Sequence, residues 1–203
     1  MVGIINYGLG NLGSIQNMLK AIGEKSIISA DKDELDKCDR YILPGVGAFD
    51  AGINRLEDAG LTDYIKNKTL NEKKPILGIC LGMQLLGRKS EEGTLGGLGL
   101  IPFDNVKFML DDTDLRVPHM GWDIVDFKQD CPLLRNLQGQ QRYYFVHSYH
   151  AKCDNVENVL MTCDYGYEFA AAVVKDNIMG VQFHPEKSHD FGMALLTNFV
   201  KEC

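Results

Sequence analysis

The sequence predicts an α/β fold: a single domain over residues 1–203, built as a three-layer sandwich around a mixed, mostly parallel β-sheet. Three observations predict it. Strand-like and helical segments alternate over the first eighty residues. The strand-like segments there are continuously apolar, as expected for parallel strands that are buried on both faces. After about residue 100, short strand-like segments follow one another with turns between them, which indicates antiparallel pairing.

The first half is predicted to alternate strands with helices, because short apolar runs are followed by apolar residues at helical spacing. The expected strands are Val2–Asn6, Ser26–Ala30, Tyr41–Leu43 and Pro75–Cys80. The expected helices are Leu12–Ile22, Phe49–Asp58, Thr62–Leu70 and one that opens at Met83–Gly87. Gly23 ends the first helix, and Pro44-Gly45 is expected to break the third strand.

The second half is predicted to be richer in hairpins. Its expected strands are Val106–Phe108, Asp123–Phe127, Tyr143–Tyr149, Val159–Cys163, Phe169–Val174 and Met179–Phe183. A closing helix is expected over Phe191–Val200, since Leu195, Leu196 and Phe199 would share one face. No linker, repeat or low-complexity segment is evident in the chain.

Composition excludes several classes of protein. The chain has 203 residues, a formal charge of −7 and 45% hydrophobic residues, which is typical of a globular protein and not of a disordered one. The acidic balance, with no cluster of Lys and Arg, argues against nucleic-acid binding. The apolar stretches fall far short of the roughly 20 residues of a membrane-spanning helix, and the N-terminus does not resemble a signal peptide. The six cysteines form no C-x-x-C pair or zinc-finger spacing, so we expect free thiols in the cytoplasm, with no metal and no cofactor.

The strongest local signal is Gly78-Ile79-Cys80-Leu81-Gly82. An apolar strand runs directly into a helix, and a nucleophilic residue at the junction has a glycine two positions away on each side. This is the nucleophile-elbow pattern with Cys in place of Ser. The helix N-terminus favours a thiolate, and the N–H of Leu81 can help to stabilise an oxyanion. The alternative is a buried structural cysteine between two packing glycines.

The second signal is Gln182-Phe183-His184-Pro185-Glu186. A cysteine nucleophile needs a base, and the base needs a partner that orients it. A late strand would deliver His184 at its end, with Glu186 two residues on to hold the imidazole. The alternative is an ordinary surface pair of a histidine and a carboxylate.

The third signal is the glycine-rich turn Pro44-Gly45-Val46-Gly47-Ala48, which follows a predicted strand. Successive backbone N–H groups in such a turn can bind an anion or an oxyanion. The alternative is a plain glycine-rich connection. A second glycine pair, in Tyr7-Gly8-Leu9-Gly10-Asn11, lacks the third glycine of a dinucleotide fingerprint, so nucleotide binding is not expected.

Together these motifs resemble the class I (triad) glutamine amidotransferases, and more closely their HisH-type members, the glutaminase subunits of imidazole glycerol phosphate synthase. The resemblance covers essentially the whole chain and implies a flavodoxin-like sandwich. It is carried by the three motifs above and by Asn6-Tyr-Gly-Leu-Gly-Asn-Leu, Pro118-His-Met-Gly-Trp, Tyr144-Phe-Val-His-Ser-Tyr and His184-Pro-Glu-Lys-Ser.

The resemblance implies roles for individual residues. Cys80 would be the nucleophile, His184 the general base and acid, and Glu186 the carboxylate that orients it. The oxyanion would lie against the N–H of Leu81 and one from Gly45-Val46-Gly47. The residues implied in glutamine binding are Gln84, Ser148 and Tyr149. Without the resemblance, Gln84 would be a solvated helix residue and Tyr143–Tyr149 a plain aromatic strand.

The resemblance also implies a partner. No second catalytic module is evident in the chain, so the ammonia acceptor would bind to another subunit, a (β/α)₈ barrel synthase, in a heterodimer. Its interface would include Asn11, Met120, Trp122 and Lys187, with Met120 and Trp122 exposed in a turn. A lone Trp is otherwise usually a core residue, and Lys187 could equally be a solvated lysine.

One departure bears on the acceptor. Asp123 stands where the family usually has Asn after Gly-Trp, which would change the electrostatics of an interface. The segments Asp164-Tyr-Gly-Tyr-Glu-Phe and Lys187-Ser-His-Asp-Phe-Gly-Met resemble HisH-type paralogues that supply ammonia to sugar amidotransferases in surface-polysaccharide pathways. The expectation is the histidine pathway, and the sugar amidotransferase is the alternative. An unrelated hydrolase with an elbow cysteine, active without a partner, and a catalytically inactive interaction subunit are further alternatives.

Overall fold

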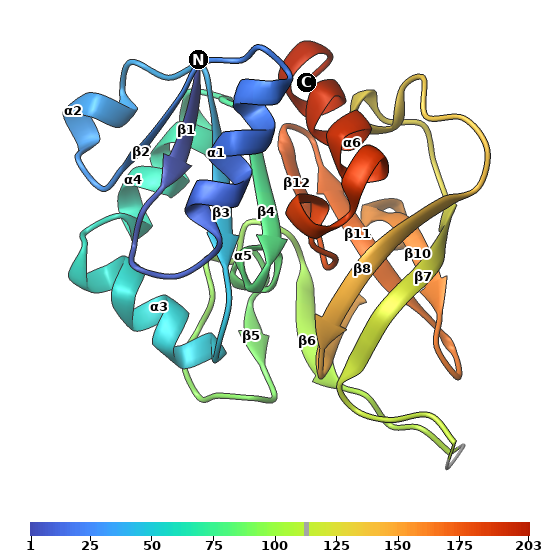
Figure 1. Cartoon of the computed structure of the whole chain (residues 1–203). Coiled ribbons are helices and arrows are strands. Elements are labelled where there is room, and N and C mark those ends of the chain that lie inside the picture. Colours follow the sequence, from blue (N-terminus) through green and yellow to red (C-terminus); the bar gives the residue numbers. More distant parts are fainter. Residues whose placement is uncertain (112–113) are drawn as a thin grey trace.

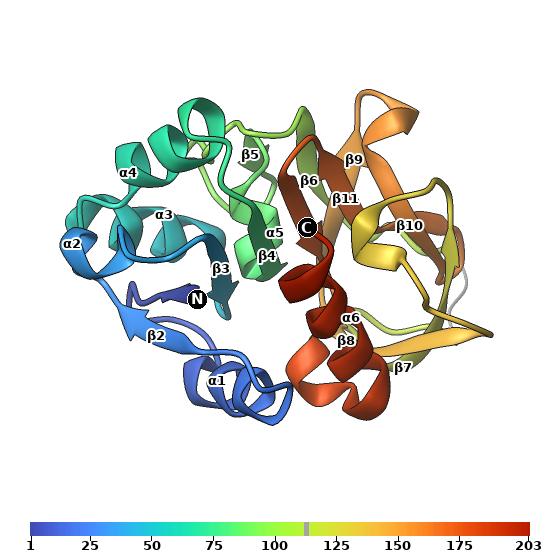
Figure 2. The same cartoon turned by 90° about the horizontal axis from the view of Figure 1, so that it is seen from above.

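The chain folds around one mixed sheet with helices on both faces of its parallel half (Figures 1 and 2). The structure, a computed structural model, describes residues 1–111 and 114–203. The main strand order is β2-β1-β3-β4-β12-β11-β10-β7-β8, and β9 joins β11 to the β5–β6 pair. The α/β sandwich with a mixed central sheet is therefore confirmed.

The strands are β1 (Val2–Ile5), β2 (Ser26–Ser29), β3 (Arg40–Gly45), β4 (Ile76–Cys80), β5 (Lys89–Ser90), β6 (Phe103–Lys107), β7 (His119–Phe127), β8 (Gln141–His147), β9 (Tyr149–Cys153), β10 (Val159–Asp164), β11 (Glu168–Lys175) and β12 (Ile178–Val181). The helices are α1 (Leu12–Ala21), α2 (Lys32–Leu35), α3 (Phe49–Asp58), α4 (Thr62–Lys66), which continues as a π-helical turn over Asn67–Asn71, α5 (Leu81–Leu85) and α6 (His189–Lys201). Among the described residues, no helix is long and apolar enough to cross a membrane.

The parallel half comprises β2, β1, β3, β4 and β12, which pair in parallel in that order. Helices α1 and α6 lie on one face of these strands, and α3 and α4 lie on the other (Figure 2). Ile15 of α1 and Phe199 of α6 are buried in one core, and Phe49 of α3 and Ile65 of α4 in the other. Apolar strands with both faces covered are what the continuous apolar runs predict.

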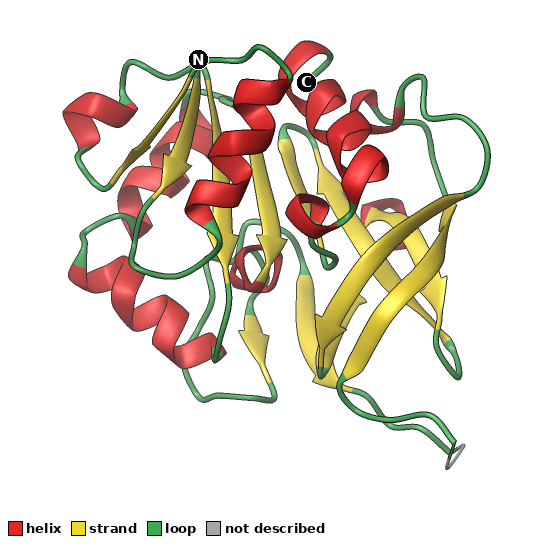
Figure 3. Cartoon of the chain, viewed as in Figure 1, coloured by secondary structure: helices red, strands yellow, loops and turns green. Residues whose placement is uncertain are grey.

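The other half is nearly free of long helices and is built from antiparallel strands, as Figure 3 shows. Strand β11 pairs with β12, β10 and β9. Strand β7 pairs with β8 from His119 to Val125, and its last two residues pair with β10. The only parallel contact here, among the described residues, is the short β5–β6 pair. The hairpin-rich second half is thus confirmed.

Three details differ from the sequence-based expectations. Pro118–Trp122 does not form a turn, because His119–Phe127 is one continuous strand that alternates between inward and exposed residues. Tyr143–Tyr149 is divided at Ser148 into β8 and β9, which have different partners. Pro44-Gly45 does not break β3, since both residues stay paired with the end of β4. Strands β5 and β9 and helix α2 were not expected.

Candidate functional site

Cys80 occupies a strained junction between β4 and α5. Its backbone has φ +54° and ψ −111°, a region that non-glycine residues rarely adopt and that is typical of a nucleophile elbow. The flanking glycines are sterically required. A Cβ on Gly78 would lie 2.7 Å from the carbonyl oxygen of Gly82, and one on Gly82 would lie 1.8 Å from that of Leu43. The turn therefore exists because both positions lack a side chain, which confirms the expected elbow.

Cys80 opens into a hollow of about 460 Å³. His184 lines the same hollow, so the structure brings together two motifs that lie a hundred residues apart in the chain. The other lining groups come from the glycine-rich turn, the start of α5 and the junction of β8 and β9. They include Val46, Gly47, Leu81, Gln84, Ser148 and Tyr149, all of which were sequence candidates.

His184 is held by a buried carboxylate. Its Nδ1 lies 2.8 Å from Glu186 Oε1, and the side chains of both residues are only 2% exposed. The Asn11 side chain donates a second hydrogen bond to the same oxygen, at 2.9 Å. The other ring nitrogen, Nε2, is buried and has no hydrogen-bond partner among the described residues. It is the nitrogen left free for the thiol or for a substrate.

The pair is electrostatically coupled. Burial works to lower the pKa of His184, but the interactions with Cys80 and Glu186 outweigh it and raise the pKa to about 10. Burial likewise works to raise the pKa of Glu186, and the contacts with His184 and Asn11 bring it below its ordinary value. A thiol beside an imidazole that a carboxylate orients is suited to nucleophilic acyl transfer, with the ring as proton carrier.

A second set of bonds fixes the turn that carries His184. The N–H of His184 donates to the carbonyl of Tyr144 on β8 at 2.9 Å. Ser188 Oγ donates to the carbonyl of His184 at 2.6 Å and accepts from the N–H of Tyr144 at 3.0 Å. Because Ser188 is fully buried, this link ties the turn to β8.

Gln182 is a site residue to which sequence reasoning assigned no role. It is fully buried, and its Nε2 lies 3.8 Å from the Cys80 sulfur as a donor. Its Oε1 accepts a hydrogen bond from Gln84 Nε2 at 3.1 Å, and Gln84 also donates to the carbonyl of Tyr149 at 3.2 Å. Gln84 is therefore not the solvated helix residue of the alternative reading. A buried polar residue two positions before His184 was the available signal.

The glycine-rich turn lies directly beside the elbow. Gly45 pairs in register with Cys80, and a Cβ on Gly45 would lie 2.5 Å from the hydroxyl of Tyr7. That hydroxyl donates to the carbonyl of Pro44 at 2.6 Å. Gly47 has φ +103°, which favours glycine. These contacts position the turn at the hollow, and they explain its glycines without reference to anion binding.

The residues expected at a partner interface lie outside the hollow. Met120 and Trp122 are 60% and 42% exposed on the outer face of β7. Trp122 stacks on His189, and the Lys187 ammonium lies 5.6 Å from the centre of the Tyr144 ring. Asn11 differs, since its side chain is engaged by Glu186. The exposure expected for Met120 and Trp122 is present, although on a strand.

Over residues 1–111 and 114–203, one group of side chains has the spacing to hold a metal ion. Ligand atoms of His119, Asp123 and Cys163 lie within 4.8 Å of one another. Both ring nitrogens of His119 already have hydrogen-bond partners, which are Asp123 and His147. Burial also raises the pKa of the Cys163 thiol, which opposes the thiolate that a metal requires. We therefore assign no metal to this group.

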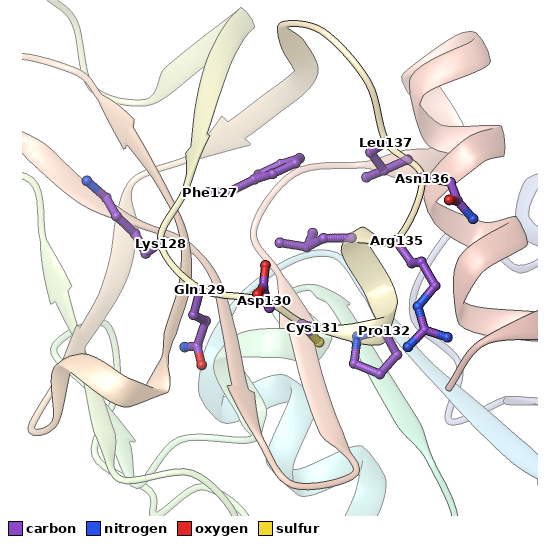
Figure 4. Close-up of a pocket in the computed structure, with 10 residues that line it drawn as sticks. Phe127, Lys128, Gln129, Asp130, Cys131, Pro132, Arg135, Asn136 and Leu137 are labelled. Carbon is purple, nitrogen blue, oxygen red and sulfur yellow. The ribbon is translucent and has the colours of Figure 1, made fainter.

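The larger hollow of about 830 Å³ lies elsewhere, beneath the segment 127–137 (Figure 4). Lys128, Asp130 and Arg135 are among the residues that line it. None of the residues that line it belongs to the Cys80 hollow. Size alone therefore does not identify the reactive site, and the chemistry of the lining residues does.

Comparison with known proteins agrees with this geometry. The family model for glutamine amidotransferase class-I matches residues 4–203. The chain is 52% identical over 203 residues to a Methanococcus maripaludis protein named imidazole glycerol phosphate synthase subunit HisH 2, and covers all of it. It is 47% identical to a Pseudomonas aeruginosa protein of the same name, with 99% of each chain covered.

Solved structures share the fold. A structure described as a glutamine amidotransferase has a TM-score of 0.73 at 17% identity, with 97% of this chain and 98% of that chain covered. The Thermotoga maritima PurLQS structure has a TM-score of 0.71 at 20% identity, with 98% and 96% covered. The full-length matches, together with the elbow cysteine and the buried His184–Glu186 pair, show that the chain belongs to the class I glutamine amidotransferase family.

Proposed function

We propose that the protein hydrolyses glutamine to glutamate and ammonia, as the glutaminase subunit of imidazole glycerol phosphate synthase in histidine biosynthesis. One observation carries the reaction: the strained Cys80 shares its hollow with His184, whose ring is held by the buried Glu186. Family membership and the printed names of the relatives support the substrate and the pathway.

The reaction follows from this geometry. The sulfur of Cys80 attacks the side-chain amide carbon of glutamine, and the amide oxygen takes up the negative charge. Backbone N–H groups of Leu81 and of Gly45-Val46-Gly47 would stabilise that oxyanion. His184 protonates the departing ammonia, which leaves a glutamyl thioester on Cys80. Water, deprotonated by His184, then hydrolyses the thioester, so that glutamate leaves and the thiol is restored.

The hollow also offers groups that suit an amino acid. Gln84, Ser148 and Tyr149 line it and would hold the substrate. Glu92 lines it too and was not a sequence candidate, and its Oε2 is fixed because it accepts from the N–H of Phe49 at 2.8 Å. A fixed carboxylate in the same hollow as the thiol is suited to the α-ammonium group of glutamine.

The proposed partner is a (β/α)₈ barrel subunit that consumes the ammonia. Met120, Trp122 and Ile124 form an exposed apolar row on β7, because alternate residues of a strand share a face. Exposed aromatic and apolar residues of this kind are enriched at interfaces. Lys187 adjoins Glu186, so the same docking surface would reach the site. Direct transfer matters because ammonia in water is mostly protonated and then is no nucleophile.

A second acceptor is favoured by a separate observation. Two relatives are named imidazole glycerol phosphate synthase subunit HisH 2, so their names carry a number that other relatives' names lack. A chain of this kind could supply ammonia to a sugar amidotransferase in surface-polysaccharide biosynthesis with the same glutaminase chemistry. Asp123 adds a carboxylate beside the row of Met120, Trp122 and Ile124. This negative charge would favour a partner with a more positive surface at that point.

The test is glutamate release from glutamine, by the chain alone and with the barrel synthase of the same organism plus its ribonucleotide substrate. The histidine-pathway assignment predicts complex formation and strong stimulation. Glutamate release with no complex and no stimulation would shift the assignment to the sugar amidotransferase. Absence of glutamate release with both partners would refute the glutaminase itself.

A further inference from the structure

A chain of hydrogen-bonded groups runs from the surface strand β7 to the wall of the hollow. Asp123 Oδ2 lies 3.0 Å from Nε2 of His119, and Nδ1 of His119 lies 3.1 Å from Nε2 of His147. Nδ1 of His147 lies 2.8 Å from the carbonyl oxygen of Tyr149. The β7–β8 register sets His119 opposite His147, and both rings are buried.

The inner end of this chain is part of the hollow. The Tyr149 carbonyl that faces His147 also accepts a hydrogen bond from Gln84 Nε2. His147, Ser148 and Tyr149 all line the hollow with Cys80. A change in the partner of this carbonyl therefore acts directly on the wall that would hold the substrate.

The number of protons in the chain decides the direction of its hydrogen bonds. When the Asp123 carboxylate is ionised both ends are acceptors, since a carbonyl oxygen never donates. Two neutral imidazole rings carry one N–H each, which supplies two protons for three contacts. One of the three contacts then has no proton and brings two lone pairs together. A third proton in the chain, or a donor group at position 123, gives each of the three contacts one proton.

The surroundings keep both rings neutral. Burial lowers the pKa of His147 to about 3, and burial lowers the pKa of His119 against the opposing effect of Asp123. In the part of the chain that the structure describes, the other titratable groups that face the rings are Cys163 and Tyr165 beside His119, and His150 and His184 near His147. Burial raises the pKa of Cys163, and the two histidines act to lower that of His147 further. When Asp123 is ionised and both rings are neutral, the chain is therefore one proton short.

The shortage of one proton removes the hydrogen bond between His147 and the Tyr149 carbonyl, at the wall of the hollow. A carboxylate accepts a hydrogen bond roughly twice as strong as a neutral acceptor does. Ionised Asp123 therefore takes the Nε2–H of His119, and His147 donates from Nε2 to His119. Nδ1 of His147 then faces the Tyr149 carbonyl without a proton. With a third proton in the chain the direction reverses, and His147 donates from Nδ1 to Tyr149.

We propose that Asp123, His119 and His147 form a positioning relay, in which a proton between Asp123 and His119 decides whether His147 donates to the Tyr149 carbonyl. The positioning role rests on the proposed function, since this carbonyl belongs to the proposed glutamine site. The relay acts through the backbone of Tyr149 and not on the reacting amide. Its outer end is solvent-accessible, as the Asp123 side chain is 36% exposed.

The first test needs no glutamine. Nitrogen-15 NMR of the ring nitrogens, on the full chain labelled at its five histidines, is recorded from about pH 5 to about pH 8. The relay predicts that the protonated nitrogen of wild-type His147 changes from Nδ1 to Nε2 as the pH rises. Asp123→Asn supplies an N–H donor of the same shape, so His147 should keep Nδ1–H throughout.

Asp126→Asn is the matched control, because Asp126 is exposed on the same strand and its substitution removes the same charge. It should change tautomer as the wild type does. A single His147 tautomer over the whole range in the wild type would overturn the relay. So would a tautomer change that persists in Asp123→Asn.

The second test measures glutamine binding by calorimetry on the Cys80→Ala chain, in which turnover is blocked. Between about pH 5 and about pH 8, the Kd for glutamine of the Cys80→Ala chain should rise about tenfold more than that of the same chain with Asp123→Asn added. This is the change expected for one lost buried hydrogen bond. Asp126→Asn should follow the parent. Equal pH profiles beside a confirmed tautomer change would refute the positioning role. No binding by any variant would refute the proposed function and this role, while the tautomer result would stand.

Discussion

Among the described residues, two buried imidazole rings each contact a carboxylate, and their pKa values shift in opposite directions. His184 lies 2.8 Å from Glu186, and His119 lies 3.0 Å from Asp123. The side chains of both histidines are only 2% exposed. The carboxylates differ, since Glu186 is as buried as its histidine whereas Asp123 is half-exposed on β7.

The pKa of His184 is raised and that of His119 is lowered. Burial opposes the charged ring in both places, so the outcome depends on the partners. His184 faces Cys80 as well as Glu186, whereas Asp123 is the only group within the described residues that raises the pKa of His119. A single, half-exposed carboxylate thus does not offset the effect of burial on the pKa of His119, whereas two partners do so for His184. The His184 arrangement suits a proton carrier, and the His119 arrangement suits a relay.

The largest expected effect is the loss of the ring that carries the proton. His184→Ala should lower kcat for glutamine hydrolysis by about 10⁴-fold, because Cys80 loses its base and ammonia its proton donor. His119→Ala is the comparison and should retain most of kcat, because its ring acts only through Tyr149. The measurement is glutamate release by both variants. Full activity of His184→Ala would contradict the assignment of Cys80, His184 and Glu186 as a catalytic triad.

The next prediction compares the change from a carboxylate to an amide in the His184–Glu186 and His119–Asp123 pairs. Glu186→Gln should lower kcat by about 10³-fold, since the amide no longer holds the His184 ring as a charged acceptor. Asp123→Asn should change the KM for glutamine and leave kcat within about twofold, because its effect is that of one hydrogen bond. Steady-state kinetics separates the two parameters. Similar losses of kcat in both variants would remove the distinction between catalytic pair and relay.

A smaller effect is expected from Asn11, which sets the position of Glu186. Asn11→Ala removes the 2.9 Å hydrogen bond to Oε1 and should lower kcat about tenfold, the size expected for a hydrogen bond to a charged group. Asn6→Ala is a suitable control, because the Asn6 side chain only accepts from the N–H of Gly8 nearby. If Asn11→Ala affects only partner affinity, the interface role expected from the sequence is the correct one.

The smallest expected effect is on stability. A group whose folded-state pKa exceeds its unfolded value stabilises fully below the unfolded pKa, and that contribution is lost as the pH rises through the folded one. For His184 this window runs from about 6.5 to about 10. Urea unfolding should show the free energy of unfolding falling across this window less steeply in His184→Gln than in the wild type. Parallel curves would contradict the raised pKa.

The sequence predicts the parallel half well, because its signals are local. Gly78, Cys80 and Gly82 specify the elbow within five residues, and the apolar strands and the periodic helix α3 are recognisable without their partners. The sequence predicts the second part of β7, Asp123–Phe127, as a strand, but it predicts a turn for Pro118–Trp122, which is wrong. The inward residues His119 and Asp123 are polar and conceal the alternation.

The relay and the role of Gln182 were not predicted, because both depend on contacts between distant segments. His119 faces His147 only once the register of β7 on β8 is known. Gln182 reaches Cys80 and Gln84 across the adjacent strands β4 and β12. Strand β9 was missed for the same reason, since its pairing with β6 and β11 is non-local.

The central claim is that Cys80 forms a covalent bond to the glutamine side chain. The most direct measurement is mass spectrometry of the chain after acid quench of a reaction with glutamine, with and without the partner subunit. The triad predicts a glutamyl thioester on the peptide that contains Cys80, and more of it in Glu186→Gln if hydrolysis of the thioester is slowed more than its formation. Glutamate release in the absence of any adduct, together with undiminished release by Cys80→Ala, would contradict the account.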